Sequence, residues 1–244
     1  MVNIVNLIDL TSLNTMDIDD NIIKLVNKAK TPKGYTAAIC IYKEFLTIAK
    51  QEFKNNNITT KDLDIATVIN FSSGDTTLKS TLMELEYALK EGATEIDLVM
   101  PYKQLVANNV SFVENYINHV RKNCSVLLKV IIESGELKTE ALISLASKIS
   151  INNGADFIKT STGKVQINAT LEAAEIMLNA IKTENPKCGF KAAGGVRTIE
   201  EANTFINLAS KIMGESYVNK KTFRFGASGL LDNVLNGAIS KANY

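Results

Sequence analysis

Short runs of apolar residues recur along the whole chain, separated by longer segments with apolar residues at helical spacing. An apolar run bounded by turn residues is typical of a buried strand, whereas spacing of three and four residues predicts an amphipathic helix. The runs predict eight strands, at residues 2–10, 36–41, 65–69, 95–100, 126–132, 157–160, 188–192 and 223–226.

The segments between these runs predict helices. Gly92 stands where a C-terminal helix cap belongs, and the run Thr198-Ile199-Glu200-Glu201 matches a capping box that opens a helix. We expect helices at residues 19–29, 44–54, 78–89, 112–122, 137–149, 171–181 and 230–239, another opening at Thr198, and a turn at residues 31–34.

Strands that alternate with helices imply a parallel sheet, because a parallel pair needs a long crossover connection. Eight such units in a chain of 244 residues, with no linker or break in composition, fit an α/β fold of one (β/α)₈ (TIM) barrel. We expect residues 1–244 to form a single catalytic domain. An open doubly wound sheet is the alternative, weakened because no G-x-G-x-x-G follows the first strand.

Five of the apolar runs each carry a charged residue. Burying five unpaired charges in separate places would cost several kcal/mol for each charge. A single network in which the charges pair with one another is therefore favoured. A barrel allows such a network, because inward positions near the C-terminal strand ends converge on a common mouth. We expect a net cationic cluster of Asp9, Asp97, Lys129, Lys159 and Lys191.

Lys159 and Lys191 fall on consecutive strands, which are neighbours in a barrel. Burial and a nearby ammonium both lower the pKa of a lysine from about 10.4, which makes the free amine available at neutral pH. One lysine could then attack a carbonyl carbon while Asp97 accepts and returns protons. The alternative is a lysine that merely extends from a strand end to water.

Small, polar or glycine-bearing loops follow the last three strands. In barrels these loops bind phosphate through backbone N–H groups and helix dipoles, although a single glycine cluster is more often only a turn. An amine nucleophile beside such loops suits a phosphorylated carbonyl compound. We expect substrate to contact Thr162, Gly163, Lys164, Gly194, Gly195, Gly226 and Ser228.

The bulk composition excludes several other classes of function. A net charge of +1 without a basic block argues against nucleic acid as a partner, and no run approaches the roughly 18 apolar residues of a membrane helix. The single histidine and three scattered cysteines favour neither a catalytic metal nor a disulfide framework, and we expect no cofactor. Without a signal-peptide pattern we expect a cytoplasmic protein, and whether it is a homodimer stays open.

Three runs, at residues 129–133, 156–163 and 189–197, resemble the deoxyribose-phosphate aldolase family of class I aldolases, and the resemblance extends from about Ile8 onward. It implies metal-free, reversible cleavage of 2-deoxy-D-ribose 5-phosphate to D-glyceraldehyde 3-phosphate and acetaldehyde. It further implies that Lys159 forms the Schiff base, Lys191 perturbs its pKa and Asp97 transfers protons. The implied polar shell around the substrate consists of Asp9, Thr11, Cys40 and Lys129.

The chain departs from this family in two places. Ala192 replaces the usual proline after the second lysine, and Gly229 replaces the second of two serines in the last loop. The loss of that hydroxyl weakens the expected phosphate site. Another Schiff-base sugar-phosphate aldolase and a non-catalytic sugar-phosphate-binding barrel remain alternatives, and Tyr244 is either a proton relay or part of a surface tail.

Overall fold

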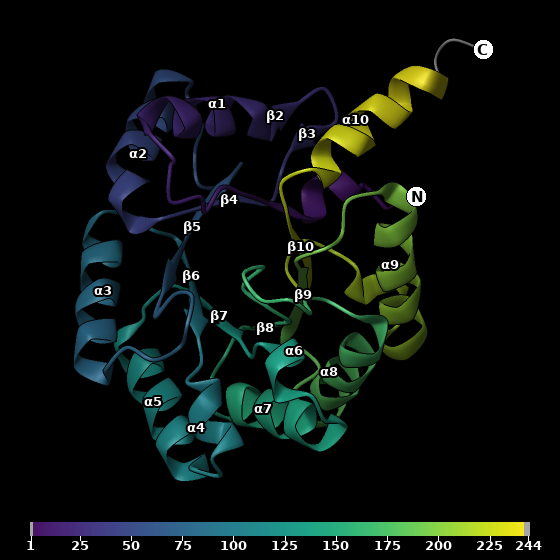
Figure 1. The fold of residues 1–244 in the computed structure, drawn as a ribbon. Helices are drawn as coiled ribbons and strands as arrows, with labels where there is room; N and C mark the ends of the chain where they lie inside the picture. Colours follow the sequence, from purple (N-terminus) through teal and green to yellow (C-terminus); the bar gives the residue numbers. More distant parts are fainter. Residues whose placement is uncertain (1, 242–244) are drawn as a thin grey trace.

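The computed structural model describes residues 2–241 of the chain, with side chains up to residue 236. Within these residues eight parallel strands close into a barrel whose strands neighbour one another in chain order, with helices around the outside (Figure 1). The predicted (β/α)₈ barrel is therefore confirmed, and Tyr244 lies outside the described residues. The barrel strands are β1 (Ile8–Thr11), β4 (Ala38–Ile41), β5 (Asp64–Ile69), β6 (Glu95–Val99), β7 (Leu127–Ile131), β8 (Phe157–Lys159), β9 (Gly189–Ala193) and β10 (Phe223–Ala227).

The helices follow the strands as expected, and four of them begin with a threonine whose side chain accepts a hydrogen bond from the backbone of the first turn. The predicted capping box is present at Thr198, where Glu201 also accepts from the backbone N–H of Thr198 at 3.0 Å. The helices are α1 (Asp19–Ala29), α2 (Leu46–Asn55), α3 (Leu78–Lys90), α4 (Tyr102–Val106), α5 (Val110–Asn123), α6 (Ser134–Leu137), α7 (Glu140–Asn152), α8 (Leu171–Glu184), α9 (Ile199–Met213) and α10 (Leu230–Lys241).

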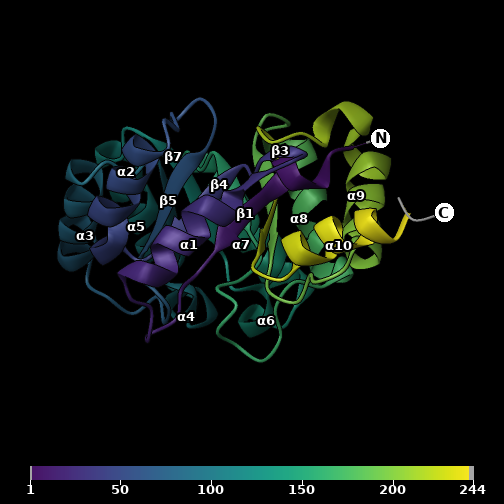
Figure 2. The ribbon, with the colours of Figure 1, turned by 90° about the horizontal axis from the view of Figure 1, so that it is seen from above.

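Short elements lie at both ends of the barrel (Figure 2). Figure 2 places α4 and α6, which follow barrel strands, at one end, and β3 at the opposite end. The predicted turn at residues 31–34 joins an antiparallel hairpin of β2 (Lys30–Thr31) and β3 (Gly34–Tyr35). The 3₁₀ turns are η1 (Ile4–Leu7), η2 (Lys43–Phe45) and η3 (Glu215–Tyr217). No helix among residues 2–241 is long and apolar enough to cross a membrane.

Two sequence predictions were wrong in detail. The strand predicted at residues 2–10 is a strand only from Ile8, because the Asn3 side chain accepts from the N–H of Val5 at 3.2 Å and caps the η1 turn. Leu137 belongs to the separate helix α6, since Lys138 has a φ of 62° and ends that turn before Thr139 caps α7.

Successive side chains of each strand point alternately out toward the helices and into the barrel, so the buried residues form an outer and an inner layer. On β6, Ile96 and Leu98 join the main apolar core between strands and helices, whereas Glu95 and Asp97 point into the barrel. A smaller apolar cluster of Leu13, Ala38, Cys40, Ala66 and Val68 forms a second core region. The outer core holds the fold together, and the inner layer carries the charged side chains.

Gly189 makes room for an aromatic ring inside the barrel. Its Cα pairs with that of Phe157 on β8, and a Cβ at Gly189 would lie 2.3–2.5 Å from three atoms of the Phe157 ring. The guanidinium carbon of Arg224 lies 5.7 Å from the centre of the same ring, within cation–π range. The missing side chain at Gly189 thus supports the placement of both residues.

We predict that Gly189→Ala lowers the free energy of unfolding by about 1–3 kcal/mol, because the added methyl group overpacks the ring. Gly229→Ala is the control, since a Cβ there meets nothing within 4 Å and the expected change is below about 0.5 kcal/mol. Urea denaturation of both variants measures the difference. Equal unfolding free energies would show that Phe157 relaxes freely and that Gly189 is not a packing requirement.

Candidate active site

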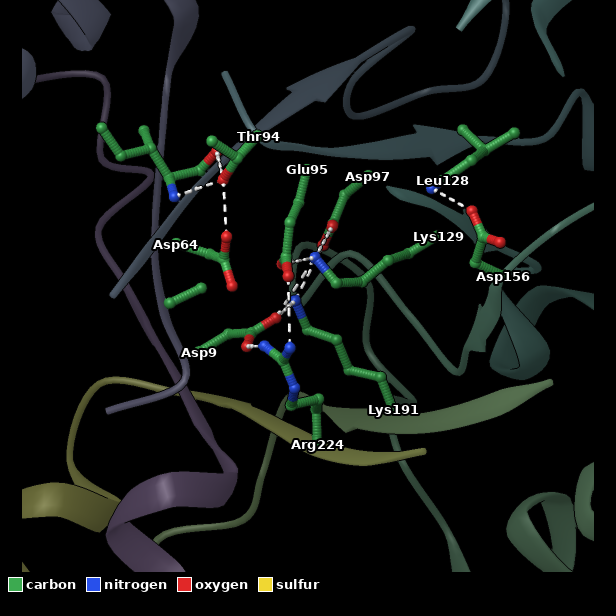
Figure 3. A network of polar contacts seen from close by, with 12 residues as sticks. Asp9, Asp64, Thr94, Glu95, Asp97, Leu128, Lys129, Asp156, Lys191 and Arg224 are labelled. Carbon is green, nitrogen blue, oxygen red and sulfur yellow. Dashed lines mark hydrogen bonds and ion pairs between the residues drawn. The ribbon is translucent and has the colours of Figure 1, made fainter. Parts of the chain in front are cut away.

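Seven charged side chains meet inside the barrel, and none of them is more than 3% exposed. Figure 3 shows six of the seven directed toward one another between the strands. They come from six strands, so no single element could assemble the group. The seven are Asp9 on β1, Glu95 and Asp97 on β6, Lys129 on β7, Lys159 on β8, Lys191 on β9 and Arg224 on β10.

The strand register brings these residues together. Asp97 and Lys129 are Cα partners across β6 and β7, and Lys159 is the Cα partner of Lys191 across β8 and β9. Lys191 is in turn the partner of Arg224 on β10. Since paired residues of neighbouring strands point to the same face of a sheet, all of these side chains project into the barrel. The predicted shared network, with Lys159 and Lys191 as neighbours, is therefore present.

Asp97 is the centre of the network. Its Oδ1 accepts a hydrogen bond from Lys129 Nζ at 2.8 Å, and its Oδ2 accepts from Lys159 and Lys191, each at 2.8 Å. Burial alone would raise the pKa of this carboxyl, but the three ammonium groups outweigh burial and hold the pKa well below its ordinary value. Asp97 is consequently a carboxylate at rest, able to accept a proton but carrying none to give.

Asp9 and Glu95 bind the remaining cations. Asp9 contacts Lys191 Nζ at 2.5 Å and Arg224 Nη1 at 2.6 Å, while Glu95 contacts Lys129 Nζ at 2.5 Å and Arg224 Nη2 at 3.2 Å. Burial acts to raise the pKa of Asp9, but the surrounding cations lower it below its ordinary value. Asp9 is thus ionised inside the protein because it is paired with Lys191 and Arg224.

Glu95 and Arg224 were missed by the sequence analysis, although each carried a signal. Glu95 lies two residues before Asp97, which puts both carboxylates on the same face of β6. Arg224 stands between Phe223 and Phe225, a charge inside an apolar run like those already noted. With these two added, four basic groups face three carboxylates, so full ionisation leaves one uncompensated positive charge.

Lys159 is the group best placed to lose that charge. It contacts a single carboxylate, Asp97, which it shares with Lys129 and Lys191, whereas the other basic groups each contact at least two carboxylates. Burial lowers the pKa of Lys159, Asp97 opposes this, and the Lys191 ammonium lowers it further, so the pKa lies below its ordinary value.

The other two lysines behave in the opposite way. Burial acts to lower the pKa of Lys191, but Asp9 and Asp97 outweigh it and the pKa lies above its ordinary value. For Lys129 burial is likewise outweighed by its carboxylate partners, and the pKa is raised well above the ordinary value. Among the three network lysines, Lys159 is therefore the one whose pKa is shifted toward the neutral amine.

A cavity of about 520 Å³ opens at the C-terminal ends of the strands, and among the seven network residues Lys159 alone lines it. Of the predicted substrate-binding set, eight residues line this cavity, whereas Asp9, Cys40 and Lys129 lie outside its lining. The eight are Thr11, Thr162, Gly163, Lys164, Gly194, Gly195, Gly226 and Ser228.

The loops around this cavity are held from several sides. Lys164 Nζ donates to the carbonyl of Leu13 at 2.8 Å, which connects the loop after β8 to the loop after β1. Gly163 and Gly195 have φ values of 81° and 97°, a backbone region that residues with a Cβ rarely adopt. Glycine is therefore the residue that suits both of these loop positions.

Glu133 is a buried carboxyl to which the sequence analysis gave no role. It directly follows the predicted strand, has a φ of 53°, and accepts from the N–H of Thr162 at 3.2 and 3.3 Å. Burial raises its pKa, and the hydrogen bonds from Thr162 oppose that shift. Glu133 holds the start of the 161–164 loop against the end of β7, a contact that only the folded chain reveals.

The cysteines of the chain are buried thiols, and the carboxylates of the network are paired with basic groups. The three cysteines are free and buried, and burial raises the pKa of Cys40, which favours the thiol over the thiolate. In residues 2–241 no group of three or more His, Cys, Asp or Glu residues is arranged to hold a metal ion. The carboxylate oxygens of the network face ammonium and guanidinium groups instead.

Comparisons with known proteins show the family of the chain. Residues 4–233 match the family model described as DeoC/LacD family aldolase. The chain is 50% identical over 233 residues to the deoxyribose-phosphate aldolase of Agrobacterium fabrum (strain C58 / ATCC 33970), covering 95% of this chain and 88% of that protein.

Solved structures show the same architecture. A protein from Coccidioides immitis, described as a candidate deoxyribose-phosphate aldolase, superposes with a TM-score of 0.83 at 27% identity and covers 96% of this chain and 85% of its own. The tetrameric deoxyribose phosphate aldolase of Aeropyrum pernix shares the fold, with a TM-score of 0.76 at 22% identity over 98% of this chain and 92% of its own. By its sequence and its barrel, the chain belongs to the DeoC/LacD family of aldolases.

Proposed function

We propose that the protein is a class I aldolase, with the barrel as its catalytic domain, that interconverts 2-deoxy-D-ribose 5-phosphate with D-glyceraldehyde 3-phosphate and acetaldehyde. The observation that carries the proposal is Lys159, a buried lysine with a lowered pKa that lines the cavity as part of a cationic network. The 50% identity to a deoxyribose-phosphate aldolase supports this choice of substrate.

The chemistry begins at the neutral amine of Lys159. Its Nζ lone pair attacks C1 of the open-chain aldehyde to give a carbinolamine, and loss of water gives an iminium ion. The C2–C3 bond then breaks as the C3 hydroxyl loses its proton, and the electron pair of that bond flows into the iminium. Glyceraldehyde 3-phosphate leaves, the enamine is protonated at C2, and hydrolysis releases acetaldehyde and the free amine.

Asp97 and Lys191 support these steps from below the cavity. Asp97 lies 2.8 Å from Lys159 Nζ, where its carboxylate can accept the proton that the carbinolamine nitrogen loses and can stabilise the positive iminium. Lys191 donates to the same oxygen of Asp97 and keeps positive potential beside Lys159. Asp9 pairs with Lys191, and Lys129 pairs with Asp97. Since neither Asp9 nor Lys129 lines the cavity, both act on the reaction through Asp97 and Lys191.

The substrate phosphate binds at a distance from the reacting carbon in this proposal. Backbone N–H groups of the glycine-bearing loops after β8, β9 and β10 surround the same cavity as Lys159, and α10 begins directly after the last of these loops. Binding energy gained at the phosphate then serves to hold C1 against the amine.

A cleavage assay tests the proposed function. We expect kcat/KM for 2-deoxyribose 5-phosphate to exceed that for unphosphorylated 2-deoxyribose by at least about 10²-fold, because each hydrogen bond to a charged group contributes about 1.5–3 kcal/mol. The measurement follows acetaldehyde through reduction by alcohol dehydrogenase and NADH. Similar values for both sugars would contradict the phosphate site, faster cleavage of another sugar phosphate would favour a different aldolase, and no cleavage would favour a binding protein.

The pH dependence tests the role of Lys191. Because the Lys191 ammonium lowers the pKa of Lys159, Lys191→Leu should raise that pKa and move the rising limb of the pH–rate profile toward alkaline pH. Lys187→Leu, an exposed change outside the network, is the control and should leave the midpoint in place. A Lys191→Leu variant that is folded by circular dichroism and keeps the wild-type midpoint would assign the tuning to burial alone.

A further inference from the structure

One wall of the cavity comes from a helix and not from the loops. Leu25 and Lys28, in the second half of α1, line the cavity that contains Lys159 and the glycine-bearing loops. The ammonium of Lys28 contacts the carboxylate of Asp232 at 2.8 Å, and both side chains are partly open to water, at 38% and 55%. The sequence analysis gave no role to Lys28 or to Asp232.

Asp232 stands at a sensitive position for an anion-binding cavity. It lies in the first turn of α10, three residues after Gly229 and the loop that lines the cavity. The N-terminus of a helix favours negative charge, so this carboxylate competes there with any bound anion. Lys28 pairs with this carboxylate and neutralises its charge. The pair therefore sets how strongly Asp232 repels an anion bound in the cavity.

Lys28 also has unused donor capacity. An ammonium group carries three N–H donors, and one contact to Asp232 leaves others for a ligand. The nearby Lys164 already donates to the carbonyl of Leu13, and Gly229 has no hydroxyl to offer. Lys28 therefore adds a charge and free donors to a cavity that Lys164 and Arg197 also line.

We propose that Lys28, held at the cavity wall by Asp232, is a specificity-determining residue that binds the phosphate dianion of the substrate. This inference rests on the proposed function, because it assigns one residue of the same site to the phosphate of that substrate. On binding, the ammonium of Lys28 bridges the Asp232 carboxylate and a phosphate oxygen. Asp232 thus positions the lysine and at the same time limits the affinity for the anion.

The two residues should then respond to substitution in opposite directions. Lys28→Met removes the donor and leaves Asp232 unneutralised beside the phosphate, so it should weaken binding. Asp232→Asn removes the repulsion and frees Lys28, so it should strengthen binding. If the pair only tied α1 to α10, both single variants would break the same contact and change binding in the same direction.

Steady-state kinetics of the full chain tests this difference. The ratio of kcat/KM for 2-deoxyribose 5-phosphate to that for 2-deoxyribose should fall about ten-fold in Lys28→Met, mainly through KM, and should rise in Asp232→Asn. The double variant Lys28→Met/Asp232→Asn should recover part of the loss. Lys24→Met, an exposed lysine one turn earlier on α1, is the matched control and should leave the ratio unchanged.

Calorimetric titration with inorganic phosphate provides a readout that does not depend on turnover. Phosphate should bind about ten-fold more weakly to Lys28→Met and more tightly to Asp232→Asn, with Lys24→Met like the wild type. Equal shifts in both single variants, or no shift in either, would overturn the proposal. A wild-type protein that binds phosphate in this pattern but cleaves no sugar would refute the proposed function while leaving the role of Lys28 standing.

Discussion

The need to pair charges inside a barrel determines how this site is built. Three carboxylates and four basic groups are buried in the barrel interior, where an unpaired ion costs several kcal/mol. All but one of the basic groups are held by at least two carboxylates, and Lys159 shares its only carboxylate with two other lysines. Lys159 is therefore the basic group whose positive charge is least compensated, and its pKa lies below the ordinary value.

In the proposed function, the same arrangement separates activation of the nucleophile Lys159 from binding of the substrate. Asp9, Lys129 and Arg224 lie outside the cavity lining, so a ligand meets Lys159 without disturbing the ion pairs that tune it. The loops after β8, β9 and β10 line the same cavity, and in the proposed function their backbone N–H groups bind the substrate phosphate. Formation of an iminium on Lys159 would restore its positive charge 2.8 Å from Asp97, and this carboxylate is the group in contact with Lys159 that stabilises the charge.

The sequence predicted the barrel and most of the network because buried parallel strands leave a plain pattern of apolar runs. A lysine within such a run, as at Lys129 or Lys191, has few alternatives to an internal partner. Glu95 escaped notice because it begins its strand, where a polar residue is ordinary, and Glu133 because its contact with Thr162 depends on how two loops fold. The depth of Asp9 and Lys129 below the cavity likewise depends on strand stagger, which no local pattern encodes.

The most direct test of the central claim is to trap the imine chemically. The protein is incubated with acetaldehyde, reduced with sodium borohydride, digested and mapped by mass spectrometry, with Lys159→Arg as the matched control, since a guanidinium cannot form the imine. We predict an ethyl group on Lys159 in the wild-type protein and none on that peptide in the variant. A wild-type protein modified at Lys191 or Lys164 with Lys159 untouched, or not modified at all, would contradict the assignment of Lys159 as the nucleophile.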